Sequence, residues 1–238
     1  MRITFRQDDV IIAFTIGKTK NKKIANDKDK IVQTYSYSVG QFNEAIKPQT
    51  TMRDFFAQDK SVCGDCPFAV NNGAKLQACY THKFTQYVGF LGQIRSIAKE
   101  FGSFEAIPTL TSKILYNILK NASGKYVRFG TYGEPSLIPF DVMELICDVA
   151  KSWTGYTHQW AKKPEYSKYL MASTHNLKQV ELAMNLGFLS FTASPIPIPS
   201  LVSCPASKES GFKSNCSKCG LCSGTEGKGD KSVVILEH

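Results

Sequence analysis

The sequence predicts an α/β fold, a partial TIM-like barrel of about six parallel strands with a cysteine-rich metal-binding C-terminal module. From residue 125 onward, strand-like runs alternate with helical patterns over short loops, as in right-handed βαβ units. Seven of the eight cysteines fall into two compact sets, within residues 63–79 and 204–222, at spacings typical of metal ligands. We therefore expect residues 1–194 to form the barrel, with a Pro-rich linker and metal-binding tail in residues 195–238.

The first half of the chain supplies an apolar run, a basic segment and two helices. The apolar run 10–16 precedes residues 18–30, which hold six lysines and two aspartates and should form a solvated loop. Residues 31–38 alternate β-branched or aromatic side chains with polar ones, which predicts a strand. Apolar side chains recur at helical spacing in residues 84–101 and 109–121, which predicts two amphipathic helices.

The second half supplies the alternating elements. In chain order we expect strand 126–131, helix 140–151, strands 154–157 and 169–173, helix 177–185 and strand 188–191. Asn176 is placed to cap the start of helix 177–185, and Gly187 follows its end. The alternating prolines of residues 195–199 suit neither a helix nor a sheet, so the chain should run extended there.

The composition is that of a soluble globular protein. Hydrophobic residues make up 42% of the chain, and no run of about 18 apolar residues occurs. The first ten residues carry charges where a secretory signal needs an apolar run. We therefore expect a cytoplasmic protein with no membrane partner. Thiols stay reduced in that compartment, so paired cysteines there are metal or redox ligands more often than disulfides.

The C-terminal cysteine set has the spacing of a cluster site. Cys216, Cys219 and Cys222 follow one another with two residues between neighbours, and Cys204 precedes a proline. Ferredoxin-type ligation uses this triplet, with a remote fourth cysteine before proline. A tail so poor in apolar residues needs a metal to fold. The spacing favours a [4Fe-4S] cluster, and zinc is the alternative because four thiolates also form tetrahedral structural sites.

The N-terminal set supplies only three thiolates, from Cys63, Cys66 and Cys79. In one interpretation His82 completes a closed zinc site, because Cys-x2-Cys-x12-Cys-x2-His is close to zinc-ligand spacing. In the other, the three thiolates hold a [4Fe-4S] cluster with one iron free to bind a small molecule. The spacing does not separate these two interpretations. Cys147 lies on an apolar helix face and is expected to be a packing residue.

Polar side chains follow three of the predicted strands. They are Glu134, His158 with Gln159, and His175 with Asn176. The carboxyl ends of parallel strands meet at one edge, so these side chains should line one site, with Glu134, His158 and His175 as candidate catalytic residues. In the structural alternative, Glu134 caps the helix that begins near Pro139, His158 packs in the core, and Asn176 only caps its own helix.

The strand end at Tyr132-Gly133-Glu134-Pro135 resembles the Gly-Gly-Glu-Pro motif of the radical S-adenosylmethionine superfamily, which contacts the methionine amino group. Tyr132 replaces the first glycine, and the gap between Cys66 and Cys79 is longer than in the usual Cys-x3-Cys-x2-Cys motif. The resemblance implies an S-adenosylmethionine-cleaving cluster at the N-terminal cysteines and an auxiliary cluster in the C-terminal module. The cofactor-binding residues that it implies are Tyr132, Gly133, Glu134, Pro135, Ser173 and Asn176.

A second resemblance covers most of the chain from Cys63 onward. Its motifs are the cysteine pair followed by Cys79, residues 128–134, 155–158 and 172–176, Cys204-Pro205-Ala206, and residues 216–222. Together they resemble the uncharacterised gene product eighty-eight family of phages and mobile elements. This resemblance supports the architecture and implies a phage or mobile-element origin, but it carries no activity.

The net charge of +9 favours an acidic partner, and nucleic acid or a nucleotide would be one. Its contacts would be the lysines of residues 18–30 and the tail lysines Lys208, Lys213, Lys218, Lys228 and Lys231. Such loops are often only solvated, and the sequence has no helix-turn-helix or RNA-binding signature. Two functions stay open: a radical S-adenosylmethionine-type iron–sulfur enzyme acting on nucleic acid or a nucleotide, and a non-catalytic nucleic-acid-binding protein stabilised by zinc or a cluster.

Overall fold

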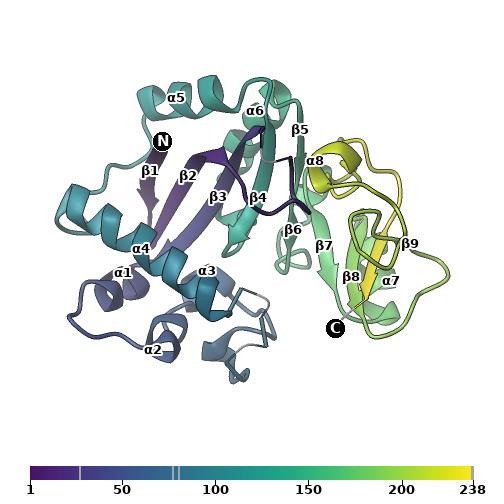
Figure 1. The fold of residues 1–238 in the computed structure, drawn as a ribbon, viewed down its shortest axis with the longest axis horizontal. Helices are drawn as coiled ribbons and strands as arrows, with labels where there is room; N and C mark the ends of the chain where they lie inside the picture. Colours follow the sequence, from purple (N-terminus) through teal and green to yellow (C-terminus); the bar gives the residue numbers. More distant parts are fainter. Residues whose placement is uncertain (27, 77, 80, 237–238) are drawn as a thin grey trace.

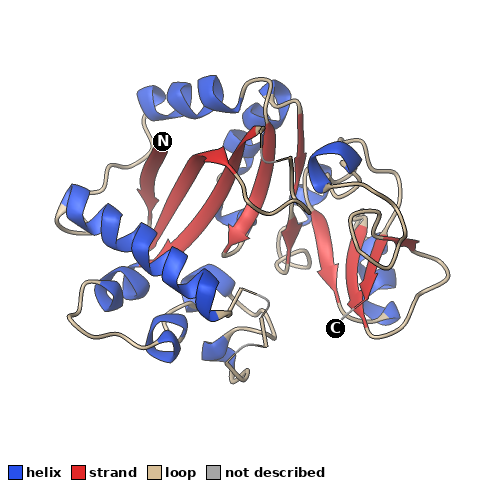
Figure 2. Cartoon of the chain, viewed as in Figure 1, coloured by secondary structure: helices blue, strands red, loops and turns tan. Residues whose placement is uncertain are grey.

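The structure is a computed structural model that describes residues 1–26, 28–76, 78–79 and 81–236. Its strands form two five-stranded sheets, in the orders β1-β2-β3-β4-β5 and β6-β7-β8-β10-β9 (Figures 1 and 2). The strands are β1 (Arg2–Gln7), β2 (Val10–Lys18), β3 (Lys30–Ser38), β4 (Tyr126–Tyr132), β5 (Ser152–Thr154), β6 (Tyr156–Thr157), β7 (Met171–Thr174), β8 (Ser190–Ser194), β9 (Val202–Ser203) and β10 (Val233–Leu236).

Helices cover both sides of the first sheet (Figure 2). The helices of the described residues are α1 (Val39–Ala45), α2 (Met52–Phe56), α3 (Lys60–Cys63), α4 (Phe84–Phe101), α5 (Ser112–Ala122), α6 (Phe140–Val149), α7 (Leu177–Asn185), which packs on β7 and β8 of the second sheet, and α8 (Cys216–Cys219), with 3-10 turns at Val70–Asn72, Pro135–Leu137 and Pro164–Lys168. Helices α4 and α7 have the predicted bounds, and α6 ends two residues before the predicted end. Within the described residues, no helix combines the length and the apolar character needed to cross a membrane.

The expectation of a mixed α/β fold is confirmed, but the expectation of an all-parallel sheet is wrong for the first three strands. The hairpin residues 8–9 join β1 to β2, with Asp8 at φ 51°, and so short a connection makes neighbouring strands antiparallel. β2 and β3 are also antiparallel. β3, β4 and β5 are parallel, as are all pairings in the second sheet. The described strands do not close into a barrel (Figure 1).

Gly155 joins the two sheets. It is the only residue between β5, which pairs with β4, and β6, which pairs with β7. A Cβ at this position would lie 2.5 Å from Leu170 Cδ2 and 2.9 Å from Phe129 Cβ, so the packing leaves no room for a side chain. The Gly155 N–H donates to the Cys222 carbonyl at 3.0 Å, and its own carbonyl accepts from the Met171 N–H at 3.0 Å. Both sheets and the C-terminal segment therefore meet here.

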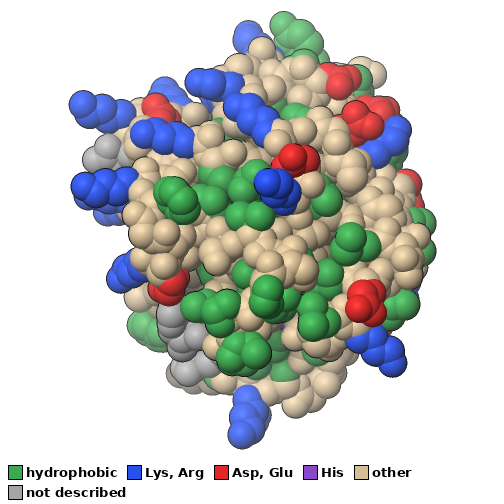
Figure 3. Space-filling model, turned by 90° about the vertical axis from the view of Figure 1, so that its right-hand side faces the viewer, with side chains coloured by type: hydrophobic (Ala, Val, Ile, Leu, Met, Phe, Trp, Pro, Cys, Tyr) green, Lys and Arg blue, Asp and Glu red, His purple; other side chains and the backbone are tan. Residues whose placement is uncertain are grey.

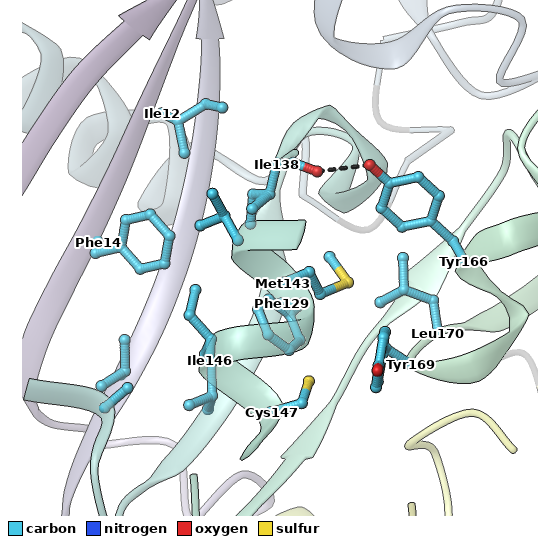
Figure 4. Packing of buried hydrophobic residues seen from close by; sticks show 14 of the residues in the cluster. Ile12, Phe14, Phe129, Ile138, Met143, Ile146, Cys147, Tyr166, Tyr169 and Leu170 are labelled. Carbon is cyan, nitrogen blue, oxygen red and sulfur yellow. Dashed lines mark hydrogen bonds between the residues drawn. The ribbon is translucent and has the colours of Figure 1, made fainter. Parts of the chain in front are cut away.

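The core has two main parts, one on each face of the first sheet. Ile12 and Phe14 of β2 belong to the hydrophobic cluster that includes Ile146 of α6 (Figure 4). Ile11 and Ala13, which point to the opposite face, belong to the cluster around α4, because successive side chains of a strand alternate between faces. Cys147 is 4% exposed within the α6 cluster, so it packs in the core as predicted (Figure 4).

Two segments pack more closely than expected. The C-terminal strand β10 lies between β8 and β9 and is parallel to both, so the boundary expected at residue 194 falls within one sheet. Residues 18–30 are not simply a solvated loop. Ile24 is 6% exposed and Ala25 is fully buried, and both pack against Tyr126 and Cys216.

Candidate metal centres

The segment that carries Cys63, Cys66 and Cys79, the N-terminal cysteine loop, lies across the carboxyl ends of β4 and β6. Helix α3 ends at Cys63, and the Glu134 N–H donates to the Val62 carbonyl at 2.9 Å. Gln159 Nε2 donates to the Cys63 carbonyl at 3.4 Å. Glu134 and Gln159 each follow the end of a strand, so these two hydrogen bonds fix the loop at the edge where the sequence predicted the site.

Gly133 allows the close approach between β4 and this loop. Its φ is +75°, which L side chains rarely adopt, and a Cβ would lie 2.8 Å from the Ser36 carbonyl oxygen and 3.0 Å from Val62 Cγ1. Steric constraints therefore require a glycine at this position of the Gly-Glu-Pro sequence. It lets the turn pass between β3 and α3 and places Glu134 against the end of β6.

Glu134 is buried and held by several donors. Its carboxylate accepts from the His158 N–H at 3.0 Å and the Ser136 N–H at 3.2 Å, and it bonds the Thr157 hydroxyl. Burial raises the pKa of Glu134 above its ordinary value, and these hydrogen bonds oppose that shift. The capping alternative is partly observed, because Glu134 caps the 3-10 turn Pro135–Leu137 and not helix α6, which begins after Pro139.

One candidate histidine, His158, bonds Glu134 through its backbone, and its ring contacts the other, His175. The rings of His158 and His175 stack with centroids 5.6 Å apart, and Phe68 of the N-terminal cysteine loop meets His175 edge-on at 4.8 Å. Burial lowers the pKa of His158 to about 4, so its ring is neutral near pH 7. The structure thus brings together the strand-end residues and the N-terminal cysteine loop.

The other residues implied by the resemblance have structural contacts. The Tyr132 ring packs in the core, where its hydroxyl accepts a hydrogen bond from Gln41 Nε2. Pro135 is buried at the start of its 3-10 turn. The Ser173 carbonyl accepts from Trp160 Nε1 at 3.2 Å. Asn176 caps α7 as predicted, because its side chain accepts from the Gln179 N–H at 2.9 Å.

The three N-terminal thiols lie among other acidic groups, with Cys66 buried and Cys63 and Cys79 half-buried. Burial raises the pKa of Cys63 well above its usual range, and the charges of Asp59, Cys66, Cys79 and Glu134 add to the shift. Burial likewise raises the pKa of Asp59 to about 6. A bound cation would relieve this mutual repulsion, and thiolates suit a soft metal.

His82 follows Cys79 by three residues and is buried. Its ring packs on the Phe56 ring, with centroids 4.0 Å apart. Burial lowers its pKa to about 4. Its backbone N–H donates to the Cys79 carbonyl at 2.9 Å. Among the described residues Nδ1 of His82 has no hydrogen-bond partner, so the zinc interpretation that uses this ring stays open.

The C-terminal set gathers four thiols from separate segments. Cys204 follows β9, and Cys216 and Cys219 begin and end α8, which Asn215 caps. The Cys222 thiol bonds the Tyr156 hydroxyl, and burial and the charges of the other three thiols raise its pKa well above its usual range. Unlike the N-terminal set, these thiols have cations nearby: Arg128 and Lys23 lower the pKa of Cys216, although burial still raises it overall.

No assembled ion site is present within the described residues, where no group of three or more His, Cys, Asp or Glu side chains is placed to hold a metal ion. All eight cysteines are free thiols. The thiols of each set nevertheless shift one another's pKa, and most of the seven are raised by burial. The donor chemistry of both sets therefore suits a thiolate-bound metal.

Sequence reasoning missed several neighbours of the thiols. Asp59 lies four residues before Cys63, a helical spacing that places both side chains on one face. Thr157 and Tyr156 belong to a predicted strand, but only the fold shows that they contact Glu134 and Cys222. No local signal indicates that Arg128 of β4 faces Cys216.

Comparisons of the chain with protein-family models, with curated proteins and with solved structures gave no match.

Proposed function

We propose that the chain is an iron–sulfur enzyme of the radical S-adenosylmethionine type. The observation that carries this proposal is the placement of the Cys63 and Cys66 thiols near the buried Glu134 at the carboxyl edge of parallel strands. Two hydrogen bonds fix the cysteine loop there, from the Glu134 N–H to the Val62 carbonyl and from Gln159 to the Cys63 carbonyl. Ligand sites of α/β sheets form at this edge.

Cys63, Cys66 and Cys79 would hold a [4Fe-4S] cluster with one iron left open. When bound, such a cluster supplies the electron that cleaves S-adenosylmethionine reductively. Glu134 would bind the methionine ammonium group through a charge-assisted hydrogen bond. Its contacts with Ser136 and His158 hold the carboxylate in one orientation, which is the preorganisation that a binding site needs.

Two further groups would border the bound cofactor. His158 is neutral near pH 7 and stacks with His175 next to Glu134, so these two side chains would contact the substrate. Cys204, Cys216, Cys219 and Cys222 would hold an auxiliary cluster that is structural or relays electrons. The excess of lysine favours nucleic acid or a nucleotide as the substrate.

A second candidate is a non-catalytic nucleic-acid-binding protein stabilised by zinc. The unpartnered, buried Nδ1 of His82 favours it, because a zinc ion on this nitrogen and three thiolates would have a full set of four ligands. In that case Glu134 would act only as the observed cap of the turn Pro135–Leu137.

Reductive cleavage of S-adenosylmethionine tests the proposal. Anaerobically reconstituted protein, reduced with dithionite, should yield methionine and 5′-deoxyadenosine. One electron comes from the reductant, the bond between sulfur and the 5′ carbon breaks, and the deoxyadenosyl group takes a hydrogen atom from substrate or buffer. Cys66→Ser should abolish the products, whereas Cys147→Ser, in the core, should keep them. Iron-loaded wild type without product would favour the binding protein.

A further inference from the structure

The lysine-rich segment of residues 18–30 is docked on the C-terminal cysteine helix. The Cys216 N–H donates to the Lys23 carbonyl and the Ser217 N–H donates to the Ile24 carbonyl, both at 2.9 Å. Asn215 Nδ2 donates to Asn26 Oδ1 at 3.4 Å. In Figure 1 the purple segment between β2 and β3 reaches the yellow C-terminal segment at α8. Two segments far apart in sequence therefore form one surface.

This surface is basic. The six lysines of residues 18–30 are exposed, whereas the apolar side chains Ile24 and Ala25 are buried beneath them. Lys213 and Lys218 are exposed on either side of Asn215 and extend the positive charge. The acidic side chains of the two segments include Asp29 and Glu209. Figure 3 shows the face on which the C-terminal segment lies, with Lys and Arg gathered toward its upper left.

An exposed aromatic residue belongs to the same C-terminal segment. Phe212 is 70% exposed and sits three residues before Asn215, next to Lys213. Its backbone N–H donates to Ser210 Oγ at 3.2 Å, so the chain holds the residue in a turn. A cationic surface with an exposed ring is the combination that binds single-stranded nucleic acid, in which lysines pair with phosphates and the ring stacks on a base.

We propose that residues 18–26, 28–30 and 208–218 form a binding surface for single-stranded nucleic acid, with Phe212 as the stacking platform. This rests on the part of the proposed function that names nucleic acid, and is independent of the cluster chemistry. A single strand fits better than a duplex because a ring can stack only on an unstacked base. An anionic membrane fits less well, since Ile24 and Ala25 are buried and unable to insert.

The test measures binding of the full chain to fluorescein-labelled oligothymidylate and oligouridylate by anisotropy at several salt concentrations. Phe212→Ala should weaken binding about tenfold, as loss of one stacked base predicts. Phe84→Ala is the matched control, because Phe84 on α4 is 69% exposed, and it should bind like wild type. Replacing both Lys213 and Lys218 by Ala should make the dependence of log affinity on log salt concentration less steep by about 1.4. Each lost phosphate contact on a single strand contributes about 0.7 to that slope. The pair Lys113→Ala and Lys120→Ala on α5 should leave the slope unchanged.

Polyglutamate and a DNA duplex serve as competitors. Weak competition by both supports the proposal. Competition by polyglutamate as strong as that by the single strand, or a Phe212→Ala variant that binds like wild type, would overturn it. If the protein binds the oligonucleotides but does not cleave S-adenosylmethionine, the proposed binding surface is supported and the proposed enzyme activity is rejected. Cleavage without binding would reject this surface alone.

Discussion

The Glu134 carboxylate accepts a hydrogen bond from the His158 backbone N–H at 3.0 Å, which ties the end of β4 to the end of β6. The two strands belong to different sheets. Glu134 therefore has a structural role whether or not a cofactor binds, and its charge also contributes to the raised pKa of Cys63 and Cys66. The first prediction follows from this double role.

Glu134→Gln should destabilise the fold by about 1 to 3 kcal/mol, because the amide NH2 replaces one acceptor and faces a backbone N–H. It should also weaken S-adenosylmethionine binding by removing a charge-assisted hydrogen bond worth roughly 1.5 to 3 kcal/mol. Urea unfolding and equilibrium dialysis measure the two effects. The exposed Glu165→Gln should change neither. A stability loss with unchanged affinity would leave Glu134 with its capping role only.

Gly155→Ala should cost about 1 to 3 kcal/mol of unfolding free energy, since its Cβ would overlap packed side chains at the junction of the two sheets. Gly89→Ala in α4 is the control, because a Cβ there meets nothing within 4 Å. That variant should gain up to about 1 kcal/mol from higher helix propensity. Equal stabilities of the two variants in urea unfolding would show that the junction is loosely packed.

Stability should fall as the pH drops below about 6.5, in part because of His158. Burial lowers the pKa of its folded state to about 4, so the unfolded chain binds more protons between these values. Between about pH 6.5 and about pH 4.5, protonation of this group should lower the free energy of unfolding by about 2 kcal/mol. His158→Gln should remove that share of the decline in urea unfolding curves, leaving the shares of other groups. Parallel pH profiles of wild type and variant would contradict the assignment.

Cys219→Ser should release metal from the C-terminal set and make the chain after Pro199 sensitive to protease. We expect this because the tail has a small apolar content and would depend on a metal at these thiols to fold. The amide hydrogens of Cys216 and Ser217 should also exchange faster, because they are the ones that donate to the carbonyls of Lys23 and Ile24. Cys147→Ser should keep the metal and the protection. A tail that stays protected without metal would show that β10 pairing alone orders it.

Local patterns were enough to predict much of the fold. The apolar spacing of α4 and the Asn176 cap of α7 lie within their own segments, so both helices have the predicted bounds. The pairing of β10 with β8 could not be predicted in this way, because it joins residues 233–236 to residues 191–194 across the whole cysteine-rich segment. The burial of Ile24 likewise depends on contact with the C-terminal segment.

In the candidate site, too, some features could be predicted from the sequence and others depend on distant contacts. The meeting of Glu134, His158 and His175 at one edge could be predicted, because it follows from parallel strands whose ends carry these residues. The hydroxyl contacts could not, because the contacts of Thr157 with Glu134 and of Tyr156 with Cys222 depend on how the two sheets pack.

The most direct test of the account is metal analysis of protein purified without oxygen. Two [4Fe-4S] clusters predict about eight iron and about eight sulfide ions per chain. Cys66→Ser and Cys219→Ser should each lose about half, and Cys147→Ser should lose none. Zinc without sulfide in the wild type, released by His82→Ala as well as by Cys66→Ser, would contradict the claim that the N-terminal cysteines hold an open cluster.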